Sequence, residues 1–172
     1  MTQEETPARK PTREVPRFGE MADDFNARVA RIVWCNMATV DRQGRPRTRL
    51  VHPIWERTPN GGLVGYLATG RTSHKGRHVS GNPWVSLGYW DAVHEQVQVD
   101  AKAEWDDNPG EKARVWELYK STPPPLGYDP QMIWRGGIED PDYGVLKLTP
   151  WRVELWGIAD LMSQAPPRVW RG

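Results

Sequence analysis

The chain has 172 residues, which is enough for one domain with a sizeable core and hardly enough for two. Its 23 Lys and Arg residues nearly balance 22 Asp and Glu residues, so no overall charge favours nucleic acid or an anionic membrane as a partner. The single cysteine, Cys35, excludes an intramolecular disulfide and a thiolate metal cluster. No apolar stretch approaches the roughly 18 residues of a membrane span, and the first residues lack a signal-peptide core. We therefore expect a single cytoplasmic domain.

The first third of the sequence predicts an arm, a helix and a β-meander. Residues 1–17 are rich in charge and proline and nearly devoid of apolar side chains, which predicts a flexible arm. In residues 18–32 the apolar positions recur at helical spacing, with acids early and arginines late, as in an amphipathic helix. Pro53 donates no ladder hydrogen bond, so it marks a sheet edge or a bulge. Strands separated by hairpin turns are expected at residues 33–41, 46–55 and 63–68.

The rest of the chain alternates strands with two further helices. A short helix is expected from Ser73 to an Asn-Pro stop, and a longer one over residues 107–120. Residues 128–142 are interpreted as an irregular lid or substrate-side loop, and residues 161–172 as a tail. Together these patterns predict one mostly β, antiparallel barrel with attached helices over residues 18–160. The remaining strands are expected at residues 84–90, 95–105, 143–148 and 152–159.

One segment, residues 69–83, has the composition of an anion-binding site. It follows a predicted strand and enters the short helix, so that free backbone N–H groups and the positive end of the helix dipole would face one point. The alternative interpretation is a solvated basic turn between two strands. Three hydroxyl groups and two cations are expected to converge there on one phosphate: Thr69, Thr72, Ser73, Arg71 and Lys75.

The sequence contains no protein-only catalytic motif. A Gly-x-Ser-x-Gly elbow is missing, and the one glycine-rich fragment, residues 61–65, precedes a strand rather than following one, which does not fit a dinucleotide fingerprint. We predict no catalytic residue and no metal site, and we expect a bound cofactor to carry the reaction. The four histidines, none at metal-ligand spacing, are His52, His74, His78 and His94.

Four groups of residues carry motifs in a fixed order along the chain. They are Gly44-Arg45-Pro46-x-x-Arg49, Thr69-x-x-x-Ser73-His74-Lys75 with Gly81-Asn82-Pro83-Trp84-Val85-Ser86-Leu87, Glu95-Gln96-Val97-x-Val99, and Pro150-x-x-Val153-Glu154-Leu155-Trp156. Together they resemble the pyridoxamine 5'-phosphate oxidase-like superfamily of flavin-binding split barrels, over about residues 32–156. In that family the first two motifs bind the flavin phosphate, the glutamine of the third meets the isoalloxazine, and the fourth is the closing strand.

This resemblance implies a six- to seven-stranded antiparallel FMN-binding split barrel of Greek-key type. It implies a flavin (FMN)-dependent oxidoreductase acting on a small molecule of unknown identity, with NAD(P)H as a candidate electron donor. It further implies a homodimer with the cofactor at the interface, and no nucleic-acid or membrane partner. The cofactor-binding residues that it implies are Arg49, Leu50, Val51, His52, Ala68, Thr69, Ser73, His74, Lys75, Gln96 and Trp156.

The sequence departs from the oxidase itself at several positions. His74 stands where the oxidase has arginine, which is expected to weaken the phosphate site or to make it sensitive to pH, because a neutral imidazole carries no charge. Ile54 corresponds to the oxidase's substrate-side lysine, and its Tyr-x-x-x-Arg-x-x-x-Ser substrate motif has no counterpart near residues 119–125. We therefore do not expect that oxidase activity. The alternatives are a deazaflavin-dependent reductase, a non-enzymatic flavin- or haem-binding module, and a cofactor-free barrel.

Overall fold

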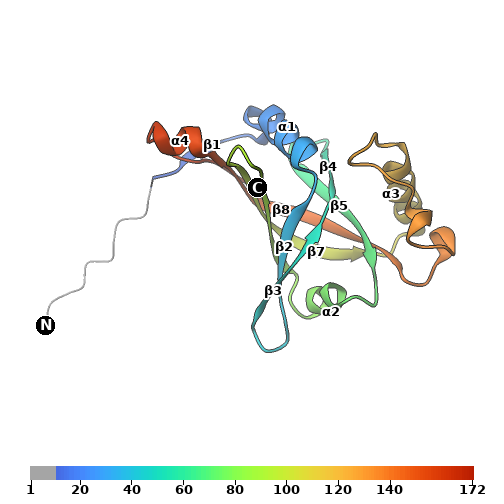
Figure 1. The fold of residues 1–172 in the computed structure, drawn as a ribbon. Helices are drawn as coiled ribbons and strands as arrows, with labels where there is room; N and C mark the ends of the chain where they lie inside the picture. The colour runs from blue at the N-terminus through green and yellow to red at the C-terminus, as the bar shows by residue number, and fades with distance from the viewer. Residues whose placement is uncertain (1–10) are drawn as a thin grey trace, which may run out of the picture.

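The computed structural model describes residues 11–172, which form a β-sheet closed on itself and flanked by helices (Figure 1). No helix in these residues is long and apolar enough to cross a membrane. The helices are α1 (Ala22–Ile32), α2 (His74–Gly81), α3 (Pro109–Ser121) and α4 (Ile158–Met162), with 3-10 turns at Phe18–Glu20, Pro130–Met132 and Gly137–Glu139. The strands are β1 (Arg13–Val15), β2 (Cys35–Val40), β3 (Pro46–Val51), β4 (Ile54–Arg57), β5 (Leu63–Gly70), β6 (Trp84–Trp90), β7 (Glu95–Asp106), β8 (Tyr143–Gly157) and β9 (Arg168–Arg171).

The sheet closes into a ring through the segment that carries β3 and β4. β3 pairs with β2 and β4 pairs with β5, and only His52 and Pro53 separate the two strands. From β2 the ring continues through β6 and β7 to β8, and the first part of β8 returns to β5. These pairings are all antiparallel. The last part of β8 pairs instead with β9, which pairs in parallel with β1.

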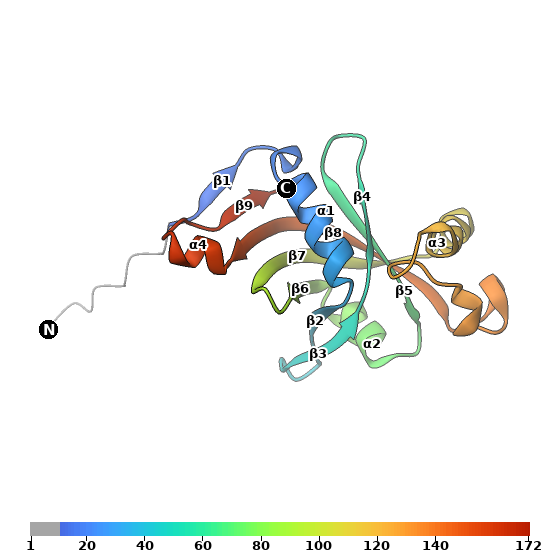
Figure 2. The same cartoon turned by 45° about the horizontal axis from the view of Figure 1, so that its top comes forward.

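Apolar side chains from the inner face of the sheet and from α1 fill the ring. The helix begins with Asp23 and Asp24 and ends with Arg31, in agreement with the helix dipole. Its buried side chains, including Phe25 and Val29, pack toward β6 and β7, which α1 crosses in Figure 2. A second apolar cluster joins α3 to β5 and β8. The inner face of β7 contributes the alternating residues Val97, Val99, Ala101 and Ala103.

Two prolines make the strands differ from the sequence-based prediction. Pro53 interrupts the predicted 46–55 strand, which therefore forms β3 and β4. Pro150 does not separate two strands, because it lies beside a bulge in a continuous β8. Ala101 pairs with Pro150 and the preceding residue of β7 pairs with Arg152, so Trp151 is the extra residue of the bulge. A bulge disrupts the hydrogen-bond ladder locally and so tolerates the missing N–H of proline.

The expected arm and tail are partly ordered, because they pair with each other. β1 lies within the predicted flexible arm and β9 within the predicted tail, and Glu14 pairs with Val169. Their apolar side chains explain the pairing, since Val15, Val169 and Trp170 are all buried. Residues 1–10, the rest of the predicted arm, lie outside the described residues.

We predict that Gly65→Ala destabilises the fold. A Cβ at this position of β5 would lie 2.5 Å from Cζ3 of Trp55, its cross-strand partner. Trp55 has little freedom to move, because its Nε1 donates to the Tyr89 hydroxyl at 2.8 Å. The expected loss is about 1–3 kcal/mol in the free energy of unfolding, measured by urea denaturation. Gly81→Ala is the control, because a Cβ there meets no atom within 4 Å; equal stability of the two variants would contradict the prediction.

Candidate functional site

The pairing of β3 with β2 positions two arginines of the site. Met37 pairs with Arg49 and Thr39 with Arg47, so both arginines lie on the same face of the sheet as the buried Met37 and Thr39. Arg49 Nη1 donates to the Met37 carbonyl oxygen at 2.9 Å and to Thr39 Oγ1 at 2.7 Å. These two hydrogen bonds fix the Arg49 guanidinium on the inner face of the edge strand.

The N-terminus of α2 uses much of its hydrogen-bonding capacity within the protein. Thr72 donates both its backbone N–H and its hydroxyl to Asp142 Oδ1 at 2.8 Å, and Arg71 pairs with Asp107. The prediction that Arg71 and Thr72 form part of a phosphate cradle is therefore wrong, because carboxylates already occupy them. Ser73 Oγ accepts a backbone N–H of α2 at 3.2 Å as the helix cap, and its hydroxyl proton stays available to an anion.

Lys75 lies in the first turn of α2 and is half-buried. Burial and the charge of Arg49 lower the pKa of Lys75, against an opposing effect of Asp142. Burial and the charge of Arg47 lower the pKa of Arg49. Within residues 11–172, neither Lys75 nor Arg49 forms an ion pair with a carboxylate. Two partly dehydrated cations without a counter-ion form an arrangement that a bound anion stabilises.

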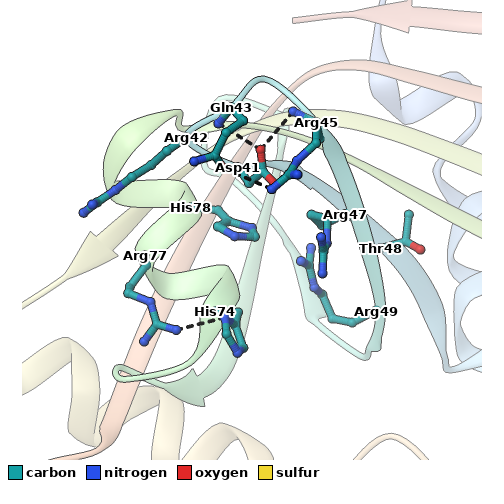
Figure 3. A pocket seen from close by; sticks show the side chains of 10 residues that line it. All are labelled: Asp41, Arg42, Gln43, Arg45, Arg47, Thr48, Arg49, His74, Arg77 and His78. Carbon is teal, nitrogen blue, oxygen red and sulfur yellow. Dashed lines mark hydrogen bonds and ion pairs between the residues drawn. The ribbon is translucent and has the colours of Figure 1, made fainter.

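Arg49 and His74 line a pocket of about 560 Å³, here called the basic pocket (Figure 3). His74 Nδ1 lies 2.9 Å from Arg77 Nη2, which donates this hydrogen bond. His78 Nδ1 lies 2.9 Å from Thr39 Oγ1, and burial and the charge of Arg49 lower the pKa of His78. The lining residues are Asp41, Arg42, Gln43, Arg45, Arg47, Thr48, Arg49, His74, Arg77 and His78.

A second pocket, of about 240 Å³ and here called the aromatic pocket, contains most of the other predicted cofactor residues. Lys75 lines it, and the basic pocket is adjacent, because the neighbouring residues Arg49 and His74 line that pocket while Leu50 and Lys75 line this one. Part of its wall comes from the irregular segment that we expected beside the substrate, at residues 128–134. The lining residues are Trp34, Leu50, Val51, His52, Leu67, Ala68, Thr69, Gly70, Lys75, Tyr128, Ile133 and Trp134.

His52 is the titratable ring in the aromatic pocket. Its ring packs edge-on against Trp34 at 4.5 Å and Tyr128 at 5.3 Å between centroids. Burial lowers the pKa of His52, so the imidazole is neutral at pH 7. Its Nε2 atom is buried and has no hydrogen-bond partner in the described part of the chain.

Gln96 and Trp156 do not join these two pockets within one chain. They pair with each other across β7 and β8, and their carbonyl oxygens both accept hydrogen bonds from Arg28 Nη1, at 3.1 and 2.8 Å. Their side chains alternate with the buried Val97 and Leu155, so they lie on the outer face of the sheet. β7 is also three strands away from β3, on the order of 14 Å at ordinary strand spacing. Gln96 and Trp156 are thus separated within one chain from the other nine predicted residues, of which eight line the two pockets and Ser73 caps α2.

Several lining residues were not found from the sequence. For the basic pocket there were signals: arginines at every second position of β3 share a face, and residues at i, i+3 and i+4 share one side of α2. For the aromatic pocket the one signal was the irregular segment 128–142, which contains Tyr128 and Trp134; nothing marked Trp34, which is far from them in the sequence. The residues missed were Arg47, Arg77 and His78 in the basic pocket and Trp34, Tyr128 and Trp134 in the aromatic pocket.

Comparison with solved structures identifies the fold class as a split barrel of the pyridoxinephosphate oxidase type, which confirms the predicted mostly β fold with attached helices. A Clostridium acetobutylicum protein related to general stress protein 26 superposes with a TM-score of 0.67 at 14% identity, covering 88% of this chain and 94% of its own. An FMN-binding protein of Nostoc punctiforme superposes with a TM-score of 0.58 at 18% identity, covering 84% of this chain and 85% of its own. The haem storage protein HutZ of Vibrio cholerae superposes with a TM-score of 0.53 at 17% identity, covering 78% of this chain and 90% of its own. At these identities the likeness concerns the fold.

The chain belongs to the pyridoxamine 5'-phosphate oxidase family, whose model matches residues 21–157. The pyridoxine/pyridoxamine 5'-phosphate oxidase of Haemophilus influenzae is 35% identical over 80 residues, which is 46% of this chain and 36% of the relative. The enzyme of the same name from Bacteroides thetaiotaomicron is 28% identical over 141 residues, which is 70% of this chain and 64% of the relative. The matched part is therefore less than two thirds of either relative.

We predict that Arg49→Gln raises the pKa of Lys75. The substitution removes a positive charge that disfavours the protonated amine, whereas the burial of Lys75 stays. The pKa is followed by the ¹³Cε chemical shift of Lys75 during a pH titration. Arg13→Gln, which removes an exposed arginine from β1, should leave it unchanged. An unchanged Lys75 pKa in Arg49→Gln would show that the two cations do not interact.

Proposed function

We propose that this protein is an FMN-dependent oxidoreductase with a small-molecule substrate. The observation that carries the proposal is the pair of cations, Arg49 and Lys75, that lack a carboxylate partner in the described residues and stand beside a pocket walled by aromatic rings. The family membership and the FMN-binding protein of similar fold support it. No cluster of His, Cys, Asp or Glu suited to a metal ion occurs in residues 11–172.

The residues present fit a flavin mononucleotide. Arg49 and Lys75 match the charge of one phosphate dianion, and the Ser73 hydroxyl adds a donor. The aromatic pocket offers an apolar wall for a planar ring, with Thr69 and neutral His52 as its polar groups. The bound flavin supplies hydride or electron transfer, and the protein's part is to bind, orient and exclude water. We propose a reduced nicotinamide nucleotide as the electron donor and the cytoplasm as the location, in keeping with the free thiol of Cys35.

We further propose that the protein acts as a homodimer with the flavin at the interface. Gln96 and Trp156 lie on the outer face of the sheet, and the phosphate-side residues lie on the inner face, so one chain does not present both to one flavin. A second copy whose outer face covers the pockets of the first resolves this conflict. The same outer face exposes large indoles at Trp84 and Trp90, which is the kind of surface that protein interfaces bury.

A haem-binding module without turnover is the second candidate. Its support is the buried, unpartnered Nε2 of His52, because a neutral imidazole nitrogen is a common iron ligand, together with the fold shared with a haem storage protein. A deazaflavin coenzyme is the third candidate, since it offers the same phosphate to Arg49 and Lys75. The absorbance of the purified protein distinguishes them: a flavin band in the blue supports the main proposal, a Soret band supports haem, and a colourless protein that takes up deazaflavin supports the third.

Arg49→Ala combined with Lys75→Ala should abolish retention of FMN, because both charges that neutralise the phosphate are removed. Flavin occupancy is measured by absorbance after gel filtration, and folding by circular dichroism and thermal unfolding. Lys120→Ala with Arg135→Ala removes the same charge from exposed positions and should retain flavin. Wild-type occupancy in the first double variant would rule out the phosphate assignment.

A mixed dimer tests the shared interface. One chain carries Arg49→Ala and Lys75→Ala, and a differently tagged chain carries Gln96→Ala and Trp156→Ala. Each homodimer should lose flavin, whereas the purified heterodimer should keep about half the wild-type occupancy, because one of its two sites combines the intact half of each chain. No flavin in the heterodimer would mean that each site is built from a single chain.

A further inference from the structure

The basic pocket contains more positive charge than one flavin phosphate requires. The proposed function, on which this inference rests, uses Arg49 and Lys75 for a phosphate whose charge is about −2. The pocket is lined in addition by three more arginines that have no carboxylate partner among the described residues. These arginines are Arg42, Arg47 and Arg77.

Four of the five arginines that line this pocket are unlike most others in the described part of the protein. Arg31, Arg114 and Arg152 illustrate the common case, in which the guanidinium forms ion pairs with carboxylates. Among the described residues, Arg42, Arg47, Arg49 and Arg77 have no such partner. The one carboxylate that lines the pocket, Asp41, is occupied by Arg45 at 2.9 Å and by backbone N–H groups of the β2–β3 turn. The pocket therefore contains an excess of positive charge.

Two walls hold these cations opposite each other, as Figure 3 shows. On the β3 wall, Arg47 and Arg49 share one face of the strand, and Arg49 is fixed by its bonds to β2. On the α2 wall, Arg77 Nη1 donates to the Thr72 carbonyl oxygen at 2.8 Å while its Nη2 bonds His74. Internal hydrogen bonds thus hold one guanidinium of each wall in place, which reduces the entropy that a ligand must remove.

We propose that the basic pocket binds a diphosphate group. Planar guanidinium groups pair with phosphate oxygens through two parallel hydrogen bonds, and two phosphoryl groups provide the several negative charges that Arg42, Arg47 and Arg77 lack. A volume of about 560 Å³ accommodates such a group. Two ligands carry it: a longer flavin nucleotide, in which the flavin phosphate is one half of the diphosphate, or a separate dinucleotide electron donor bound beside FMN.

The test titrates inorganic pyrophosphate into the full-length protein by calorimetry, with inorganic phosphate as the comparison. The flavin-free protein can bind a diphosphate that includes the position of the flavin phosphate, whereas the FMN-loaded protein can bind only a separate diphosphate. Pyrophosphate should bind the wild-type protein more tightly than phosphate. Arg42→Gln with Arg47→Gln should weaken pyrophosphate binding at least about tenfold, the effect of losing one to two charge-assisted hydrogen bonds. Neither residue is among those proposed to bind the flavin phosphate, so FMN occupancy should be retained. Arg13→Gln with Arg135→Gln, exposed elsewhere, removes the same charge and should leave the affinity unchanged.

The remaining arms identify the source of the diphosphate and separate this inference from the proposed function. Preference for FAD over FMN that is lost in Arg42→Gln/Arg47→Gln supports the longer flavin, and binding of reduced nicotinamide dinucleotide to the FMN-loaded protein supports the separate donor. If both double variants weaken pyrophosphate binding equally, or if neither weakens it, the diphosphate site is overturned, even if FMN is retained. A protein that binds no flavin but binds pyrophosphate through these arginines overturns the flavin proposal alone.

Discussion

The register between β2 and β3 is the constraint on which the charged part of this protein depends. Because Met37 is opposite Arg49, two arginines lie on the inner face of the sheet, beside α2, while the apolar Leu50 faces outward. A slip of one residue would exchange these faces. The buried Thr39 makes the register specific, since its hydroxyl accepts from Arg49 and contacts His78. One hydroxyl thus links the edge strand to the helix across the basic pocket.

Arg28 has the corresponding role at the other end of the sheet. This buried guanidinium extends from α1, pairs with Asp24 at 2.8 Å, and donates to the carbonyl oxygens of Gln96 and Trp156. The desolvation of a buried cation is offset only when its donors are satisfied, and here two backbone carbonyls and a carboxylate satisfy them. The positions of Gln96 and Trp156 are therefore tied to α1 rather than to the strands that carry Arg49. Two independent supports hold the two groups of candidate residues.

Local patterns in the sequence were sufficient for most of the fold. Period-two alternation located β7, helical spacing located α1, and Asn108 and Ser73 act as helix caps. Long-range pairing was not accessible in this way. Nothing near Arg71 in the sequence indicates that Asp107 neutralises it, and nothing near Gln96 indicates which face of the sheet it occupies relative to Arg49. The aromatic pocket likewise joins segments whose proximity only the closed ring creates.

The parallel pairing of β1 with β9 has a consequence for the order of assembly. Arg13 and Arg168 are separated by nearly the whole described chain, so their pairing closes the longest loop and carries the largest entropy cost of loop closure. Because β9 also pairs with β8, this contact forms only after β8 is in place. The β2–β3 hairpin needs only a short turn. Arg49 therefore rests on a local hairpin, whereas Trp156 lies one residue beyond the part of β8 that pairs with β9. We expect the β1–β9 pair to form later, and to open at a lower free energy, than the β2–β3 hairpin.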